Sequence, residues 1–361
     1  MNVEEARAAF PVLERLAYLN AGTFGPLARA TVEAMHERLD RDLRDGRSGG
    51  RFMEEGARLR EETRSRLAAL LSVPPEHVAL TTSTTRGCNI AVAGLRLKPG
   101  DEVVTTDNEH FGLLGPLHAS GASVRVARLR GRSASDAFEL IAAEVGPRTR
   151  LLALSHVSWL TGHVLPVDEL RAAFDVPILV DGAQSVGAIP VDASGFDFYT
   201  VSGQKWLCGP DTTGALYVAD PERLEVATPS YFAQQTYEPD GRFTAKEGAA
   251  RFDSDWLPFA SVAGLVAAID SAPEWRFEAA AATARRCRAL LLEAGIEVVT
   301  EPGHSTLVTF VPRGDPAETA AAAYENGVVV RDLTGTPWIR ASCGYWTNED
   351  DLERLLAAIV S

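Results

Sequence analysis

Short β-rich runs alternate with helical stretches along most of the chain, and this alternation limits the possible folds more than any other feature. Each run ends in Gly, Ser, Thr or Asp, and the stretch after it has apolar residues spaced three or four positions apart. Examples are HVALTT before RGCNIAVAGL, and DEVVTT before HFGLLGPLHA. Strands that alternate with helices require crossover connections, so the sequence predicts an α/β fold with a mostly parallel sheet.

The character of the sequence changes about two thirds of the way along the chain. An Ala-rich helical region then precedes several short strands and two further helices, which is typical of an α+β unit. A chain of 361 residues is also long enough for two cores. We therefore predict a large domain over 18–260 and a smaller C-terminal domain over 261–361, which the N-terminal segment 1–17 joins. Thr347 and Asp350 predict a capping box at the start of the last helix.

The composition is that of an ordinary globular enzyme, with 46% hydrophobic and 23% charged residues. No segment approaches the apolar length of a membrane span, and the acidic, helical start MNVEEARAAFP differs from a signal peptide, so we expect a cytoplasmic protein. A net charge of -14 disfavours nucleic acid and anionic membranes as partners.

The cysteines and histidines show no metal or disulfide pattern. Four cysteines are scattered without a C-x-x-C pair, which argues against a disulfide framework and a structural zinc site. His156 and His163, in SHVSWLTGH, could form a metal pair, but no third ligand lies near them in the sequence. We expect a core or structural role for both and predict no metal.

Lys205, in the stretch VSGQKW, is one of only three lysines in a chain with 32 arginines. Its neighbours resemble a buried strand and a tight loop, where an ammonium group would lose most of its hydration. An amine can condense with an aldehyde, whereas a guanidinium cannot. The other two lysines, Lys98 and Lys246, lie in hydrophilic turns. Lys205 is therefore the candidate for covalent chemistry.

Further polar residues follow two predicted strands. Asp181 ends the apolar run ILVD with Gln184 three residues on, and Ser202 and Gln204 end the next run beside Lys205. Ligands of open α/β sheets gather at the carboxyl ends of the strands, so these residues are site candidates. Taken alone, Asp181 and Lys205 are equally consistent with a structural salt bridge.

The pattern DGAQSVG (181–187), followed about twenty residues later by SGQK (202–205), resembles the class V aminotransferase family of pyridoxal phosphate (PLP) enzymes. This family includes cysteine desulfurases, cysteine/cystine C–S lyases and epimerase-like members. The resemblance extends from YLNAGTFGP (18–26) to IRASCGYWTNEDDLERLL (339–356). It implies PLP fold type I, with a mostly parallel seven-stranded sheet between helices in the large domain and a smaller α+β C-terminal domain.

The resemblance gives each polar residue an expected role. Lys205 would hold PLP as a Schiff base, and Asp181 would pair with the pyridine nitrogen so that the ring can act as an electron sink. Gln184 would donate to the phenolic oxygen of the ring. His110, after another strand end, matches the E-H motif of the family, whose imidazole stacks on PLP.

The phosphate of PLP would lie at the start of a helix, where backbone N–H groups and the helix dipole favour an anion. Thr84 and Thr85 begin such a helix in TTSTTRGCNIA, and Ser202 and Gln204 would complete the phosphate site. A Thr-rich turn on its own is usually only a helix cap. The family commonly has His in place of Gln204, so this contact keeps a donor and loses a charge.

The substrate carboxylate requires a cation, and the planar fork of arginine suits it. Arg340 matches the carboxylate-binding arginine of the family, and Arg331 precedes it on a loop facing the same site; either could instead be a surface arginine. Trp159 and Leu160 stand where the family often has Asn, which suggests a more apolar wall.

The family implies a homodimer whose partner chain helps to close the site. Its members commonly have a threonine that reaches the neighbour's phosphate, and the segment RFDSDWLP (251–258) places Trp256 or Asp255 at that position. Trp256 would supply an apolar wall beside the substrate. The alternative is that Trp256 only anchors the interface, where tryptophan is enriched.

The reaction depends on the loop between the two arginines. Cysteine desulfurases carry a nucleophilic cysteine there, whereas this loop, DLTGTP, has none, and Cys343 lies beyond Arg340 in an expected strand. The sequence is therefore most similar to the C–S lyase branch, which implies β-elimination on a cysteine-derived substrate to give pyruvate, ammonia and a thiol or persulfide. Transamination and epimerisation stay open, because one fold supports all three. A non-catalytic PLP-binding protein with a regulatory or assembly role is a further alternative, against which the intact lysine, aspartate and arginine argue.

Overall fold

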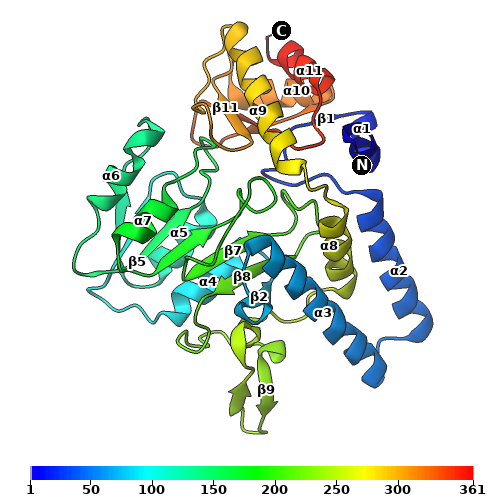
Figure 1. The fold of residues 1–361 in the computed structure, drawn as a ribbon, viewed down its shortest axis with the longest axis vertical. Helices are drawn as coiled ribbons and strands as arrows, with labels where there is room; N and C mark the ends of the chain where they lie inside the picture. Colours follow the sequence, from blue (N-terminus) through cyan, green and yellow to red (C-terminus); the bar gives the residue numbers. More distant parts are fainter. Residues whose placement is uncertain (1, 361) are drawn as a thin grey trace.

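The structure is a computed structural model that describes residues 2–360 and has a large and a small domain (Figure 1). The large domain is built on a seven-stranded sheet and the small domain on a three-stranded sheet. Within residues 2–360, every helix is too short or too polar to span a bilayer.

The seven-stranded sheet is parallel except for one strand. Its order is β2-β8-β7-β6-β5-β3-β4, and β8 runs antiparallel to both of its neighbours. This confirms the expected α/β fold with a mostly parallel seven-stranded sheet. The strands are β2 (Val78–Thr81), β3 (Glu102–Thr106), β4 (Ser123–Ala127), β5 (Thr149–Ser155), β6 (Ile178–Asp181), β7 (Phe198–Ser202) and β8 (Gly214–Val218).

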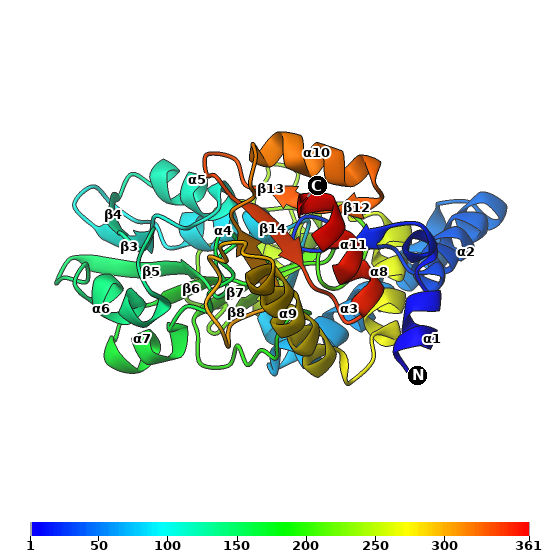
Figure 2. The same cartoon turned by 90° about the horizontal axis from the view of Figure 1, so that it is seen from above.

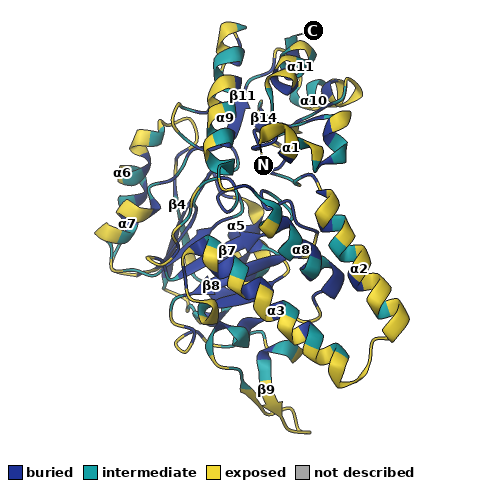
Figure 3. Ribbon diagram, turned by 45° about the vertical axis from the view of Figure 1, so that its right-hand side comes forward, coloured by how far each residue is buried: buried dark blue, intermediate teal, exposed yellow. Residues whose placement is uncertain are grey.

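Helices cover both faces of this sheet. Along β5, Leu152 and Leu154 pack into a core with α3, α6, α7 and α8, and Leu151 and Ala153 pack into a second core with α4 and α5. Strands covered on both faces need apolar residues throughout, which explains the continuous apolar run of β5. Figure 3 shows β7 and β8 buried, with the outer sides of α2 and α3 exposed. The helices are α2 (Arg29–Asp45), α3 (Gly49–Leu71), α4 (Thr84–Gly94), α5 (Phe111–Ala119), α6 (Ala137–Ala142), α7 (Val167–Ala173) and α8 (Phe259–Ser271).

The small domain packs a short antiparallel sheet against three helices. β14 lies between β11 and β13, and Figure 2 shows α9, α10 and α11 beside β13 and β14. The N-terminal segment belongs here too, because β1 pairs with β12 in parallel, and Ala17 and Leu19 lie in the small-domain core. The elements are α1 (Val3–Ala8), β1 (Ala17–Tyr18), α9 (Arg276–Glu293), β11 (Leu307–Phe310), α10 (Pro316–Glu325), β12 (Val328–Val329), β13 (Arg331–Asp332), β14 (Ile339–Ser342) and α11 (Glu349–Val360).

The remaining elements are short and lie in the connections. A hairpin projects from the large domain at the end opposite the small domain (Figure 1). Its strands are β9 (Gln234–Tyr237) and β10 (Phe243–Ala245), and the 3-10 helices are η1 (Pro11–Glu14), η2 (Pro75–His77), η3 (Ala134–Asp136), η4 (Tyr231–Ala233) and η5 (Gly248–Phe252).

Two sequence expectations need adjustment. The expected boundary between residues 260 and 261 falls inside α8, whose Val262 and Leu265 pack in the core of the large sheet, so the core changes only after this helix. The expected capping box is displaced by one residue. Asn348 Oδ1 accepts from the Asp351 N–H at 3.0 Å, and the Asp351 carboxylate accepts from the Asn348 N–H at 3.1 Å. Thr and Asn are both good caps, so the sequence did not separate the two registers.

Candidate active site

A cavity of about 250 Å³ lies where the ends of β5, β6 and β7 meet the small domain, and we call it the site cavity. It combines residues from three parts of the chain: the N-terminal segment, the strand ends of the large domain, and the β13–β14 region. Its lining is Gly22, Thr23, Phe24, His110, Ser155, Val157, Trp159, Asp181, Ala183, Gln184, Lys205, Arg331 and Arg340.

Asp181 and Lys205 both line the site cavity, as the strand-end argument predicted. Asp181 is the last residue of β6 and is 4% exposed, and its Oδ1 accepts from the Ala183 N–H at 2.9 Å. Burial lowers the pKa of the Lys205 amine to about 8, Arg340 acts in the same direction, and Asp181 opposes it. A larger share of the amine is therefore free at neutral pH than in an exposed lysine, which is what a nucleophile or a base requires.

His110 caps α5, and this fixes its ring. The His110 Nδ1 accepts from the Gly112 N–H at 3.1 Å, so a neutral ring carries its proton on Nε2. Burial lowers the pKa of His110, and the nearby Lys205 adds to this effect, which favours the neutral form. The ring meets Trp159 edge-on, with centroids 5.3 Å apart. A neutral imidazole of fixed orientation therefore borders the site cavity.

The start of α4 lies beside the site cavity without lining it. Thr84 and Thr85 are its first two residues, as expected, and the preceding Ser83 is its cap. A Cβ added to Gly112 would lie 2.5 Å from Thr85 Oγ1 and 3.3 Å from His110 Nδ1, so Gly112 lets the two helix starts approach each other. The backbone N–H groups of α4 are thereby placed next to His110.

The two other expected phosphate ligands are also near the start of α4. Ser202 pairs with Gly214 across β7 and β8, and a Cβ added to Gly214 would lie 3.0 Å from the Ser83 nitrogen. Ser202 Oγ donates to Gln204 Oε1 at 2.8 Å. Gln204 lines a neighbouring hollow of about 690 Å³ rather than the site cavity. Their roles toward a phosphate stay predictions.

Gln184 is held at both ends of its amide. Nε2 donates to the Gly22 carbonyl at 2.8 Å, and Oε1 accepts from the Trp206 indole at 2.9 Å. One N–H of the amide is left for a ligand, which limits the expected contact with the phenolic oxygen to that hydrogen.

Arg340 is a buried cation that has no carboxylate partner among residues 2–360. It is 2% exposed, its Nη1 donates to the Trp159 carbonyl at 2.8 Å and its Nη2 to Thr23 Oγ1 at 3.3 Å, while Nε has no partner. Burial, together with Arg331, lowers the pKa of Arg340 to about 9. Arg331 is exposed and stands opposite Arg340 in the β13–β14 pairing. A guanidinium held this way is prepared to receive an anion.

The segment 18–26, which follows the N-terminal segment 1–17, contributes residues that were not predicted to belong to the site. Gly22 and Thr23 contact Arg340, and a Cβ at Gly22 would lie 2.7 Å from Arg340 Nη2. The Gly25 N–H donates to the Gln204 carbonyl at 2.8 Å, next to Lys205. The segment YLNAGTFGP carried the family resemblance, but its sequence gives no sign of contacts with residues so distant in the chain.

Glu109 was also missed, although it directly precedes His110. It is 5% exposed, and its carboxylate accepts from Thr106 Oγ1 at 2.8 Å, from the Ser155 N–H at 3.0 Å and from the Ser155 hydroxyl. Burial raises the pKa of Glu109 to about 7, and Asp181 contributes to the shift. An acidic residue just after a strand end was the available signal.

Trp256 lies outside the site cavity of this chain. It is 54% exposed, and its ring stacks on Tyr231 with centroids 6.4 Å apart and meets Phe232 edge-on at 4.7 Å. A contact between Trp256 and substrate therefore requires a second chain and stays a prediction.

The two histidines weighed as a metal pair bind protein groups. His156 Nδ1 and the Tyr199 hydroxyl share a hydrogen bond of 2.7 Å, and His163 Nε2 accepts from the Glu301 N–H at 3.2 Å. Among residues 2–360, no three His, Cys, Asp or Glu side chains are grouped for a metal ion.

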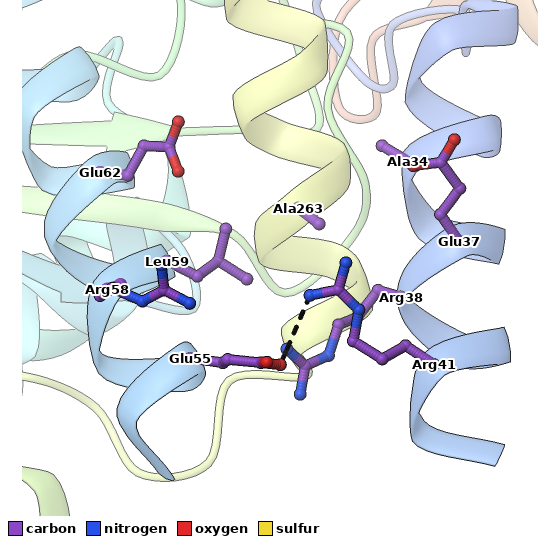
Figure 4. A pocket seen from close by; sticks show the side chains of 9 residues that line it. All are labelled: Ala34, Glu37, Arg38, Arg41, Glu55, Arg58, Leu59, Glu62 and Ala263. Atoms are coloured by element: carbon purple, nitrogen blue, oxygen red, sulfur yellow. Dashed lines mark hydrogen bonds and ion pairs between the residues drawn. The ribbon is translucent and has the colours of Figure 1, made fainter. Parts of the chain in front are cut away.

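A second cavity, of about 260 Å³, lies between α2, α3 and α8 (Figure 4). Its central charges pair with one another, since Glu55 lies 3.4 Å from Arg41 and 3.7 Å from Arg38. None of the candidate residues lines it, so we place the active site in the site cavity.

The aminotransferase class-V family model matches residues 18–355. The chain belongs to the class V aminotransferase family. Isopenicillin N epimerase of Streptomyces clavuligerus is 29% identical over 99% of this chain and 97% of that protein. Cysteine desulfurase CsdA of Escherichia coli (strain K12) is 28% identical over 99% and 97%. The solved structure of the cystine C–S lyase C-DES with its reaction product cysteine persulfide has a TM-score of 0.89 at 29% identity, covering 98% of this chain and 99% of that one.

This class V aminotransferase chain is thus a PLP-dependent enzyme, and PLP is its cofactor. A mutant of C-DES with glycine covalently linked to PLP matches with a TM-score of 0.91 at 28% identity, covering 98% of this chain and 99% of that one. The residues present fit the group. Asp181 is a buried carboxylate that would suit the pyridine nitrogen, Lys205 is a partly buried amine that would suit the aldehyde, and the start of α4 has backbone N–H groups that would suit the phosphate.

Proposed function

We propose that this enzyme cleaves the C–S bond of a cysteine-derived amino acid by β-elimination, giving pyruvate, ammonia and a thiol or persulfide. The observation that carries the proposal is the site cavity, in which an amine (Lys205), a carboxylate (Asp181) and a buried guanidinium (Arg340) meet, and whose lining includes no cysteine of the described residues. The likeness to the structure of C-DES, a cystine C–S lyase, supports it.

Five residues of the site cavity have a task in the proposed reaction. PLP, when bound, withdraws electrons from the substrate Cα and makes its proton acidic. Arg340 binds the substrate carboxylate and so orients the Cα–H bond, and the Lys205 amine takes the proton from Cα. Trp159 and Val157 exclude water from the side of the leaving sulfur, and the neutral His110 flanks the ring without adding a charge.

Cys343 does not take part as a nucleophile. It follows β14, is fully buried, and lies outside the site cavity. Its hydrogen bond with Cys287 and its burial raise the thiol pKa, so a reactive thiolate does not form there. The sulfur of the substrate therefore leaves as a product and is not transferred to this cysteine.

The second candidate is epimerisation at Cα, which the match to isopenicillin N epimerase over nearly the whole chain favours. Elimination and epimerisation share proton removal and differ in whether a leaving group departs from Cβ. Transamination is the third outcome of the same proton removal. A purely regulatory PLP-binding role is disfavoured, because it would not require a carboxylate-binding arginine together with Lys205 and Asp181.

We further propose that the enzyme is a cytoplasmic homodimer acting on a small amino acid. The hollow of about 690 Å³ beside the site cavity is bordered by Phe24 and Leu27, which are 50% and 43% exposed. Exposed Trp256 and Tyr231 add a second apolar surface. Such surfaces are typical of protein interfaces.

A turnover assay tests the proposed reaction. The holoenzyme is incubated with L-cysteine, L-cystine or an S-alkyl-L-cysteine sulfoxide, and pyruvate, other keto acids and D-isomers are measured. Pyruvate from at least one of these substrates, in a one-to-one ratio with ammonia, is expected. Formation of D-isomers without pyruvate would replace elimination with epimerisation.

A further inference from the structure

Residues 159–164, here called the 159–164 strip, lie in the loop between β5 and α7 and are hydrogen-bonded to the small domain at every position. The four carbonyls from Trp159 to Gly162 each accept from a different small-domain side chain. The donors, in the order of the carbonyls, are Arg340 at 2.8 Å, Thr309 at 2.6 Å, Thr300 at 2.6 Å and Ser305 at 2.7 Å.

Two histidines, His163 of the strip and His304 of the small domain, make the last two hydrogen bonds of this contact. His163 Nε2 accepts from the Glu301 N–H at 3.2 Å, and the Val164 N–H donates to His304 Nδ1 at 3.0 Å. The two rings are 4.8 Å apart between centroids. Both hydrogen bonds require a ring nitrogen without a proton, so these two contacts exist only while the histidines are neutral. Protonation of both would also place two positive charges side by side.

The backbone of the strip is shaped for this contact. Gly162 has a φ of +73°, which favours glycine, and a Cβ there would lie 2.7 Å from the Leu307 carbonyl oxygen. Only a residue without a side chain allows β11 to come so close. The strip is thus fitted to the small domain along its whole length.

The charged groups around the pair are few. The carboxylate of Glu301 faces both rings, and Arg285 and Arg288 of α9 line a cavity of about 400 Å³ with Glu301 and His304. Burial lowers the pKa of His163, with His304 acting in the same direction and Glu301 opposing. Burial likewise lowers the pKa of His304 against the effect of Glu301. The contact between the 159–164 strip and the small domain is therefore most stable above the ordinary histidine pKa of about 6.5. Its stability decreases as the pH falls below that value, because protonation of the rings favours the separated state.

We propose that His163 and His304 are positioning residues for Arg340, and that their protonation loosens the 159–164 strip and weakens binding of the substrate carboxylate. The link is direct, because the Trp159 carbonyl at one end of the strip holds Arg340 Nη1. The proposal rests on the proposed function in one respect, namely that Arg340 binds the carboxylate.

The test uses the holoenzyme and the double variant His163→Gln/His304→Asn, whose amide oxygens can accept the same N–H groups and do not titrate. Hydrogen–deuterium exchange of peptides covering 159–164 and 299–305 is compared at about pH 7.5 and about pH 5.5, corrected for intrinsic rates. The dissociation constant of 3-mercaptopropionate, which has a carboxylate and no amine to react, is measured by calorimetry at both pH values. His118→Gln, which alters an exposed histidine of α5, is the matched control.

In the wild type and in His118→Gln, acidification should raise both the corrected exchange and the dissociation constant about tenfold, because protonation removes both ring acceptors and breaks their two hydrogen bonds. In the double variant both quantities should change less than about twofold. Wild-type exchange that is unaffected by pH, or a double variant with the wild-type pH response, would overturn the proposal.

If 3-mercaptopropionate binds at neither pH, the carboxylate role of Arg340 fails, and the exchange comparison alone decides whether the histidines hold the strip. Each single variant, His163→Gln and His304→Asn, should show an intermediate response, and this repeats the comparison if the double variant folds poorly.

Discussion

The strand ends of the large domain and the boundary between the domains both build the active site, but they differ in how their residues are assembled. At the strand ends, Asp181 and Lys205 are presented by β6 and the loop after β7, within one sheet. At the boundary, Arg340 is held by Thr23 of the segment 18–26 and by the Trp159 carbonyl of the large domain. In the proposed reaction, the first region would supply the reactive groups, and the second region would orient the substrate against them.

This difference explains what the sequence could predict. Strand-end chemistry depends on local order along the chain, so the motifs with Asp181 and Lys205 predicted the fold and the cofactor, which are confirmed, and two residues that line the site cavity, whose reactive roles stay predictions. Gly22 was missed because its importance comes from a close approach to Arg340 that no local pattern encodes, whereas Glu109 was missed although its place just after a strand end was a local signal. The boundary at residue 260 was placed too early for a similar reason, since only packing shows that α8 belongs to the large sheet.

The largest loss of activity is expected from a substitution at the strand ends. Lys205→Ala should lower kcat by about 10³-fold or more, because it removes the group that takes the proton from Cα. Borohydride should fix PLP to the wild-type peptide that contains Lys205, as detected by mass spectrometry. Lys246→Ala is the control, since Lys246 lies outside the site cavity and should leave kcat unchanged. Labelling of Lys98 or Lys246 would show that Lys205 is not the residue that binds PLP and that the reactive groups lie outside the site cavity.

The boundary region should affect binding rather than chemistry. Arg340→Ala should raise KM strongly while PLP stays bound, because loss of a charge-assisted bidentate contact costs on the order of 2–5 kcal/mol. Steady-state kinetics and the absorbance of the bound cofactor measure the two effects separately. An unchanged KM for the amino-acid substrate would remove Arg340 from the site.

A smaller effect at the same boundary would sharpen the comparison. Gly22→Ala places a Cβ 2.7 Å from Arg340 Nη2, so the guanidinium must shift and KM should rise by about tenfold, or roughly 1.4 kcal/mol. Gly195→Ala adds a methyl group where no atom lies within 4 Å and should leave KM unchanged. Equal KM values in the two variants would show that the segment 18–26 does not position Arg340.

The smallest change in activity is expected from a substitution outside both regions. Trp256→Ala should alter the ratio of kcat/KM between a thioether and a charged substrate by a few fold, roughly 1 kcal/mol, with no loss of PLP. Sedimentation should show a dimer for both proteins. A dimeric variant with an unaltered substrate profile would leave Trp256 as an interface anchor only, and a fully active monomer would remove the partner chain from the site.

The central claim is that the two regions together direct proton removal toward loss of sulfur, and proton NMR of L-cystine turnover in D₂O tests it most directly. The account predicts pyruvate whose methyl group carries solvent deuterium, with little deuterium at Cα of the remaining cystine. Deuterium at Cα with a growing fraction of D-configured or meso-cystine, and no pyruvate, would contradict it.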